Sequence, residues 1–78
     1  TDDELIQKYA KLNDIDPILV LSLMKQESAF DEGAGSSVGA LGLMQLMPAT
    51  AVQTDPKVQV SQLLQAEDNI RVGTLYLK

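Results

Sequence analysis

The chain has 78 residues, enough for one domain at most. It contains no cysteine and no histidine, so disulfide bonds and the usual metal ligands are excluded, and neither a metal nor a cofactor is predicted. Six basic residues against eleven acidic ones give a net charge of −5, and no cluster of Lys and Arg could follow phosphates, which argues against nucleic acid as a partner. No apolar run is long enough to span a bilayer.

Two helices are predicted in the first part of the chain. Thr1 and Glu4 have the spacing of a capping box, and apolar residues then recur at helical intervals, which predicts a helix over residues 2–12. Asp16 followed by Pro17 is typical of an N-cap with proline at the first helical position, so a second helix is expected to begin there. Apolar side chains cover a wide arc of this second helix, as expected of the central helix of a fold.

The rest of the sequence alternates turn signals with short helical patterns. Small and turn-forming residues predict a loop over residues 31–39. Two short helices are expected next, one over the apolar residues 41–47 and one opened by Pro48. Residues 58–64 fit either an extended segment or a short helix, and residues 66–78 are predicted to be a helix. Because no repeat or linker interrupts it, the chain is predicted to be one all-α unit.

Glu27 is the first candidate for chemistry. It lies near the end of the second predicted helix, on the same side as the apolar residues Val20, Leu23 and Met24. Burial among apolar neighbours and the negative end of the helix dipole both favour the protonated carboxyl group. A glutamic acid that stays protonated near neutral pH can protonate a leaving oxygen. The alternative is a solvated surface carboxylate, which is what most glutamates on amphipathic helices are.

A longer pattern of residues surrounds Glu27. It consists of Glu27-Ser28-Ala29-Phe30, Ser36, the stretch Gly39-Ala40-Leu41-Gly42-Leu43-Met44-Gln45-Leu46-Met47-Pro48-Ala49-Thr50-Ala51, and a later set with Asn69-Ile70, Gly73, Tyr76 and Leu77. In order and spacing it resembles the signature of the soluble lytic transglycosylase family, which is related in fold to goose-type lysozyme. The resemblance extends from about residue 10 to residue 78 and implies a lysozyme-like helical lobe.

This resemblance also implies a reaction and a set of site residues. In that family a single glutamate cleaves the β-1,4 bond between N-acetylmuramic acid and N-acetylglucosamine of peptidoglycan, because the C6 hydroxyl of the substrate attacks the anomeric carbon and gives a 1,6-anhydro product. Carried over to this sequence, Glu27 is the general acid/base, Ser36 contacts the sugar near its N-acetyl group, and Met44 and Gln45 line the glycan groove. Ser36 as a plain turn residue and Met44 as a plain core residue are the alternatives.

Other residues near Glu27 are expected either to have structural roles or to take no part in the site. Ser28 is expected to pack the helix end, and Gly39 and Gly42 to stand where a side chain would obstruct backbone packing or the sugar. A glycoside hydrolase usually needs two carboxylates at a defined separation. Asp31 and Glu32 are the only nearby acidic residues, and we expect them to be solvated because they lie on a glycine-containing loop.

The family pattern is incomplete in this sequence. Asp31-Glu32 stand where the family usually has Asn-Pro, and nothing matches the later Ala-Tyr-Asn-Ala-Gly motif, whose tyrosine supports the catalytic glutamate in the family. We therefore predict that residues 1–78 form the N-terminal part of a lytic transglycosylase catalytic domain and lack its C-terminal half. Ile70, Leu75 and Leu77 would then need cover from that half or from self-association.

Three functions remain as hypotheses. The favoured one is a peptidoglycan lytic transglycosylase that acts outside the cytoplasm, in the periplasm, at the cell wall or after secretion, with a peptidoglycan glycan strand as its partner. The second is a non-catalytic glycan-binding or assembly module derived from the same fold. The third is a small helical interaction protein whose likeness to the family is accidental.

Overall fold

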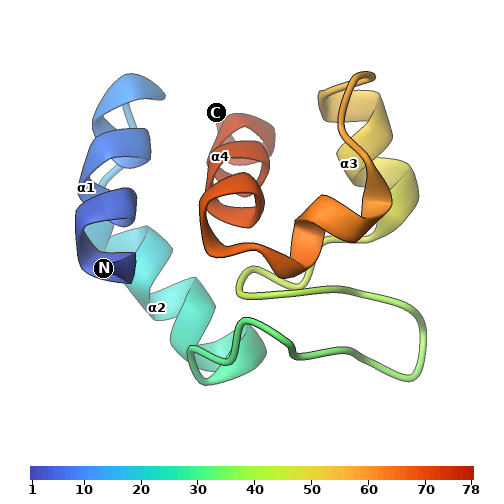
Figure 1. Cartoon of the computed structure of the whole chain (residues 1–78). Coiled ribbons are helices and arrows are strands. Elements are labelled where there is room, and N and C mark those ends of the chain that lie inside the picture. Colours follow the sequence, from blue (N-terminus) through green and yellow to red (C-terminus); the bar gives the residue numbers. More distant parts are fainter.

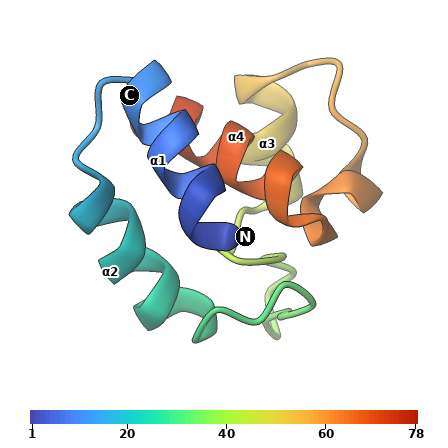
Figure 2. The same cartoon turned by 60° about the vertical axis from the view of Figure 1, so that its left-hand side comes forward.

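The computed structural model describes all 78 residues and contains helices and turns but no strand. In chain order the elements are α1 (Asp2–Leu12), α2 (Pro17–Ser28), α3 (Pro48–Thr54), the 3₁₀ helix η1 (Val60–Leu64) and α4 (Ala66–Leu77). Helix α4 lies between α1 on one side and α3 on the other, with η1 leading into it (Figures 1 and 2). The predicted all-α fold is confirmed. None of the helices combines the length and apolarity that a membrane crossing requires.

Helices α1 and α2 begin at the predicted capping residues. The Oγ1 atom of Thr1 accepts a hydrogen bond from the backbone N–H of Glu4 at 3.3 Å. The Oδ1 atom of Asp16 accepts one from the backbone N–H of Ile18 at 2.9 Å. Helix α2 ends at Ser28, because the φ of 51° at its C-cap Ala29 is in the left-handed region and stops the helical ladder. These local signals fix where α2 starts and where its last turn meets the following loop.

Helix α4, and not α2, is the central helix. Helix α2 packs mainly on α1 and buries only Val20 and Met24, whereas Ile18 and Leu19 are exposed. The residues that α4 buries are Asn69, Ile70, Val72, Gly73 and Thr74. The expectation of a central α2 is therefore wrong. An apolar arc shows that a helix could be buried, but which arc is covered depends on the packing of the other helices.

The core consists of two apolar clusters that meet on α4. The first joins residues of α1 and α2 to the segment before α3 and to α4: Ile6, Tyr9, Ala10, Val20, Met24, Leu43, Met44 and Ile70. The second contains Leu46, Ala51, Val58, Leu63 and Val72. Among the residues expected to lack cover, Ile70 is fully buried, so that expectation is wrong for it, while Leu75 and Leu77 are exposed.

Residues 41–47 form a turn and not the expected short helix. Leu41 and Leu46 exchange two backbone hydrogen bonds, each of 2.9 Å, so the chain between them reverses direction. Gly42 and Gln45 have positive φ values of 74° and 50°, which a right-handed helix cannot contain. We call this segment the Leu41–Leu46 turn. The other predicted short helix is present as α3, and of the two alternatives for residues 58–64 the short helix, η1, is found.

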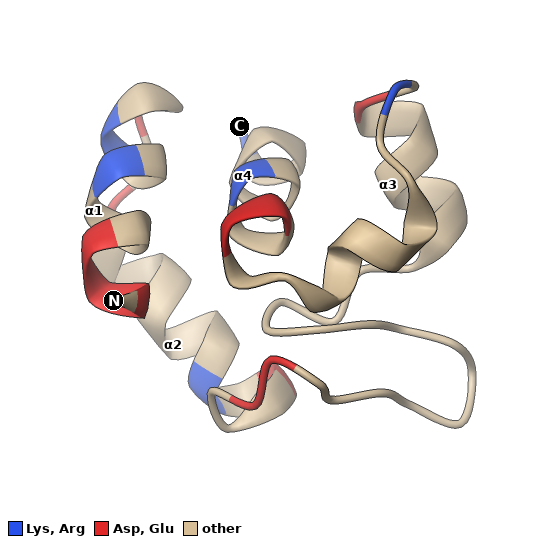
Figure 3. Cartoon of the chain, in the orientation of Figure 1, with Lys and Arg blue, Asp and Glu red and all other residues tan.

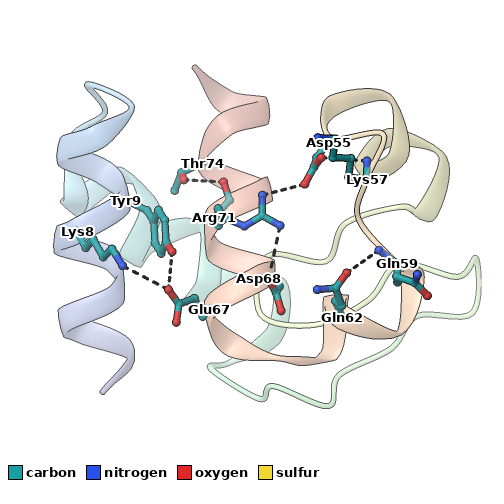
Figure 4. Close-up of polar contacts among 10 residues, drawn as sticks. All are labelled: Lys8, Tyr9, Asp55, Lys57, Gln59, Gln62, Glu67, Asp68, Arg71 and Thr74. Carbon is teal, nitrogen blue, oxygen red and sulfur yellow. Dashed lines mark hydrogen bonds and ion pairs between the residues drawn. The ribbon is translucent and has the colours of Figure 1, made fainter.

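Polar side chains connect α4 to its neighbours on both sides (Figure 4). Toward α1, the hydroxyl of Tyr9 donates to Glu67 at 2.5 Å, and the ammonium of Lys8 approaches the same carboxylate at 3.4 Å. Toward the end of α3, the guanidinium of Arg71 donates to Asp55 at 2.9 Å. The hydrogen bond from Tyr9, helped by the one from Lys8, lowers the pKa of the Glu67 carboxyl group. These contacts fix the rotation of α4, which presents its other face to the candidate site.

Candidate active site

A cleft of about 250 Å³ brings together three parts of the chain that are distant in sequence. Its walls come from the end of α2, from the Leu41–Leu46 turn with the start of α3, and from the last turns of α4. The lining residues are Leu23, Glu27, Met44, Gln45, Leu46, Met47, Thr50, Gly73, Tyr76 and Leu77. Of the four predicted site residues, the structure places Glu27, Met44 and Gln45 in this cleft, and leaves Ser36 outside it.

Glu27 lies in the last turn of α2 at the open edge of the cleft. It is the only acidic residue of the lining, its side chain is exposed, and its carboxylate makes no hydrogen bond within the chain. The expected burial of Glu27 is therefore wrong for this chain. Val20 and Met24 turn into the core, but the last turn of α2 extends past that core, so the apolar neighbours on the same side of the helix do not cover the carboxylate.

Met44 and Gln45 take different parts in the cleft. Met44 is only 9% exposed and belongs to the core, and it also lines the cleft, while its contact with a glycan stays a prediction. The Nε2 group of Gln45 donates to the carbonyl oxygens of Ala34 at 3.0 Å and Gly42 at 2.9 Å. Nε2 makes two hydrogen bonds in this way, and the Oε1 atom of this cleft residue is left without a partner within the chain.

Ser36 is exposed and closes a turn of the loop. Its Oγ atom accepts a hydrogen bond from the backbone N–H of Ala40 at 3.0 Å, and the two backbones are also paired. Asp31 and Glu32 are exposed as expected, and neither lines the cleft. The turn role of Ser36 is thus present in the structure, while its contact with a sugar stays a prediction.

The structure shows the supporting roles expected for Ser28 and Gly42, but not the packing role expected for Gly39. The hydroxyl of Ser28 donates to the carbonyl oxygen of Met24 at 3.1 Å and so secures the end of α2. A Cβ atom at Gly42 would collide with the carbonyl oxygen of Leu63, so close packing requires glycine there. Gly39 has open space around it, and its φ of 95° is the reason for glycine. The expectation of a packing role is wrong for Gly39.

Sequence reasoning placed no residue of α4 in the site, yet α4 forms one wall. Gly73, Tyr76 and Leu77 line the cleft. They are spaced by three and four residues, which puts them on one face of a helix, so the sequence could have grouped them. That this face looks toward Glu27 depends on how α4 packs on α1 and α3. No group of three or more acidic, histidine or cysteine side chains is arranged to hold a metal ion.

Comparison with known proteins identifies the family of this chain. Residues 4–78 match the family model described as the transglycosylase SLT domain. The chain belongs to this family. Among its relatives, the soluble lytic murein transglycosylase of Salmonella typhimurium is 38% identical over 97% of this chain and 13% of that protein. The membrane-bound lytic murein transglycosylase C of Actinobacillus pleuropneumoniae is 40% identical over 94% of this chain and 22% of that protein.

Solved structures of the same family share the fold of this SLT chain. An inactive glutamate-to-glutamine mutant of the lytic transglycosylase Slt from Pseudomonas aeruginosa has a TM-score of 0.90 and 38% identity, covering 95% of this chain and 13% of the mutant chain. A complex of the 70-kDa soluble lytic transglycosylase with bulgecin A gives a TM-score of 0.90 at 38% identity over the same shares. The predicted lysozyme-like helical fold is confirmed. The chain spans about an eighth of these proteins.

Proposed function

We propose that this chain supplies the acid/base glutamate of a lytic transglycosylase that acts on peptidoglycan outside the cytoplasm. The observation that carries the proposal is that Glu27 is the only acidic residue lining the cleft of a chain of the SLT family. The names of the relatives specify murein as what they act on. A related Slt protein with one glutamate replaced by glutamine is described as inactive, which supports a reaction that depends on a single glutamate.

The proposed reaction needs one carboxyl group because the substrate provides the nucleophile. The Glu27 carboxyl group donates its proton to the oxygen of the β-1,4 bond between N-acetylmuramic acid and N-acetylglucosamine as that bond breaks. The C6 hydroxyl of the muramic acid residue then attacks the anomeric carbon, and the Glu27 carboxylate takes the hydroxyl proton. The product is a 1,6-anhydro sugar, and no water is consumed. Hydrolysis would require a second carboxylate in the cleft, and Asp31 and Glu32 lie outside it.

The other site residues would bind the glycan. The Oε1 atom of Gln45 can accept a hydrogen bond from a sugar hydroxyl or amide, and Met44 contributes an apolar part of the cleft lining. The hydroxyl hydrogen of Ser36 has no acceptor within the chain, so it can be donated to the carbonyl oxygen of an N-acetyl group. In this proposal residues 1–78 are the N-terminal part of the catalytic domain, and the C-terminal half or a second copy covers the open side of the cleft.

A chimera tests the proposal. This chain replaces the matching segment of the Salmonella soluble lytic murein transglycosylase, and the products formed from purified peptidoglycan are weighed by mass spectrometry. We expect anhydro-muropeptides, lighter by one water than hydrolysis products. Glu27→Gln in the chimera should lower the rate by about 10²–10⁴-fold, because it removes the proton but keeps the shape. Glu32→Gln, outside the cleft, is the matched control and should change the rate little.

Two results would contradict the proposal. If Glu27→Gln retains the rate of the chimera, Glu27 is not the acid/base. If the main products carry a reducing muramic acid, the enzyme is a hydrolase, and Asp31→Asn and Glu32→Gln would then be tested for the second carboxylate.

The second candidate function is a glycan-binding module without catalysis. Its support is the environment of Glu27, which is exposed and has no hydrogen-bond partner within the chain to orient it. A chimera that binds peptidoglycan but releases no anhydro product would select this function over the first.

A further inference from the structure

The side chain of Asn69 ties the base of the cleft together from inside the core. Asn69 lies on α4 and is fully buried. Its Oδ1 atom accepts from the backbone N–H of Met44 at 2.8 Å, and its Nδ2 group donates to the carbonyl oxygens of Leu41 at 3.0 Å and Leu63 at 2.8 Å. An asparagine amide has two N–H groups and one oxygen, and all three are used. One side chain therefore links the start and the middle of the Leu41–Leu46 turn to the end of η1.

Two glycines allow the turn to lie directly on α4. A Cβ atom at Gly42 would collide with the amide of Asn69, and a Cβ atom at Gly73 would collide with the sulfur atom of Met44. Asn69 and Gly73 are four residues apart, so they share one face of α4 and contact the same turn. Because the fit is this close, the turn cannot shift on α4 without breaking hydrogen bonds or steric contacts.

The same turn carries Gln45 into the cleft. Gln45 has a φ of 50°, and its side-chain amide donates to the carbonyl oxygens of Gly42 and Ala34. The place and direction of its free Oε1 atom therefore depend on how the turn is held. Asn69 itself is fully buried and is not part of the cleft lining, so it cannot contact a ligand there.

We propose that Asn69 is a positioning residue for glycan binding: by holding the Leu41–Leu46 turn on α4, it sets where Met44 and Gln45 meet the sugar. The identity of the ligand rests on the proposed function. A buried asparagine with a merely structural role would affect stability and leave the affinity of the folded protein unchanged. A positioning residue also changes the affinity, and does so through Gln45.

The chain offers a matched control in Asn13, a second buried asparagine. Asn13 is 6% exposed, and its Nδ2 group donates to the carbonyl oxygen of Tyr9 and to the hydroxyl of Thr74 on α4, away from the cleft lining. Asn69→Ala removes a buried amide that joins α4 to the Leu41–Leu46 turn, and Asn13→Ala removes one that joins the end of α1 to α4. Both should lower the melting temperature.

The experiment measures binding and local opening in the 78-residue chain, at a temperature where each variant is folded. Calorimetric titration uses a peptide-free tetrasaccharide of alternating N-acetylglucosamine and N-acetylmuramic acid. Asn69→Ala should raise the Kd about tenfold and Asn13→Ala less than about twofold. Gln45→Ala should raise the Kd in the unsubstituted chain but add little in the Asn69→Ala background, because the turn is already displaced. Without ligand, Asn69→Ala should speed amide hydrogen exchange at Met44 and Leu46 relative to α1, and Asn13→Ala should not.

If Asn69→Ala does not fold, Asn69→Ser replaces it, since its short neutral side chain adds no buried charge and cannot make the bonds to Leu41, Met44 and Leu63 together. An unchanged Kd in the Asn69 variant, or a full additional effect of Gln45→Ala, would overturn the positioning role. Exchange at Leu46 that is no faster than in Asn13→Ala would also overturn it. If the unsubstituted chain does not bind the tetrasaccharide, the same titrations are made in the chimera. A chimera that does not bind either would contradict the proposed function, and the exchange data decide separately whether Asn69 holds the turn.

Discussion

The two sides of the Leu41–Leu46 turn differ in how their polar groups are satisfied. On the side of α4, Asn69 is fully buried and each polar atom of its amide has a partner. On the side of the cleft, the Glu27 carboxylate and the Oε1 atom of Gln45 have no partner within the chain. Buried polar groups must be paired for the fold to be stable, whereas groups that bind a ligand must be left free for it. The turn therefore has paired polar groups on its α4 side and unpaired polar groups on its cleft side.

Glu27 also differs from the other acidic residues of the helices in its position relative to the helix dipole. Acidic residues occupy the first turns of α1 and α4, where they favour the positive end of the helix dipole (Figure 3). Glu27 is in the last turn of α2, at the negative end. A carboxylate at that end lacks the favourable dipole interaction of the acidic residues in α1 and α4, so it contributes nothing to helix stability.

The largest effect on stability is expected at the paired side of the turn. Gly42→Ala places a Cβ atom against the Leu63 carbonyl oxygen and the Asn69 amide, at a φ of 74°, and should destabilise the fold by about 3 kcal/mol or more. Gly39→Ala is the matched control: its φ of 95° is also unfavourable, but the space around it is open, and a loss of about 1–2 kcal/mol is expected. Urea unfolding measures both. Equal losses would show that close packing at Gly42 is unimportant.

Local signals in the sequence predicted the parts of the fold that depend on few residues. Thr1 and Asp16 cap their helices because a capping bond joins neighbours in the chain. The Leu41–Leu46 turn was not predicted, since a left-handed conformation at Gln45 has no local signature and the turn is held by bonds to the distant Asn69 on α4. The central helix was misassigned because α4 buries Asn69 and Thr74, which an apolar pattern does not count.

The site could be predicted as far as the motif extends. Glu27, Met44 and Gln45 line one cleft and Ser36 lies outside it, while the roles that the resemblance implies for all four stay predictions. Tyr76 and the α4 wall depend on tertiary packing, and so does the exposure of Glu27, which follows from how far α2 extends past the core. The sequence motif identifies candidate site residues. The burial and the hydrogen bonds of each residue depend on contacts between distant segments.

Because one side of the cleft is open, we expect the isolated chain to fold but to catalyse the reaction slowly. We expect the 78-residue chain alone to form anhydro-muropeptides at least about 100-fold more slowly than the chimera, since Glu27 is exposed and no hydrogen bond within the chain orients its carboxylate. Rates are compared at equal molar concentration, with circular dichroism confirming that the chain is helical. A rate for the isolated chain close to that of the chimera would show that the exposed Glu27 needs no further support.

A smaller effect is expected from the pH dependence of the α1–α4 contact. The hydroxyl of Tyr9 lowers the pKa of Glu67 below its ordinary value of 4.5, so this contact stabilises the fold above about pH 4.5 and its contribution is lost as the pH falls through the lowered pKa. The same bond raises the pKa of Tyr9 above 10.0, so the contribution is also lost as the pH rises through that raised value. Plotted against pH, the melting temperature is expected to fall along an acid limb and an alkaline limb. Tyr9→Phe should make the fall along both limbs smaller.

Tyr76→Phe is the control for this series, since the hydroxyl of Tyr76 is exposed and makes no hydrogen bond within the chain. It should leave both limbs unchanged. Unaltered limbs in Tyr9→Phe would mean that the acid and alkaline losses of stability come from other pairs, such as Arg71 with Asp55.

The smallest effect on stability is expected at the residue with the largest effect on activity. Glu27→Gln should change the free energy of unfolding of the 78-residue chain by less than about 0.5 kcal/mol, because the side chain is exposed and has no partner to lose. Removing a carboxylate from the negative end of α2 even favours a slight gain. The measurement is urea unfolding of both chains at neutral pH, paired with the rate of the chimera carrying the same substitution. A clear loss of stability would show that Glu27 has a structural contact that the open cleft does not reveal, and a lowered rate in the chimera would then report unfolding as well as chemistry. Glu27→Gln is thus expected to leave stability unchanged and to lower the rate by orders of magnitude. Substitution of Asn69, which holds the fold, is instead expected to lower stability.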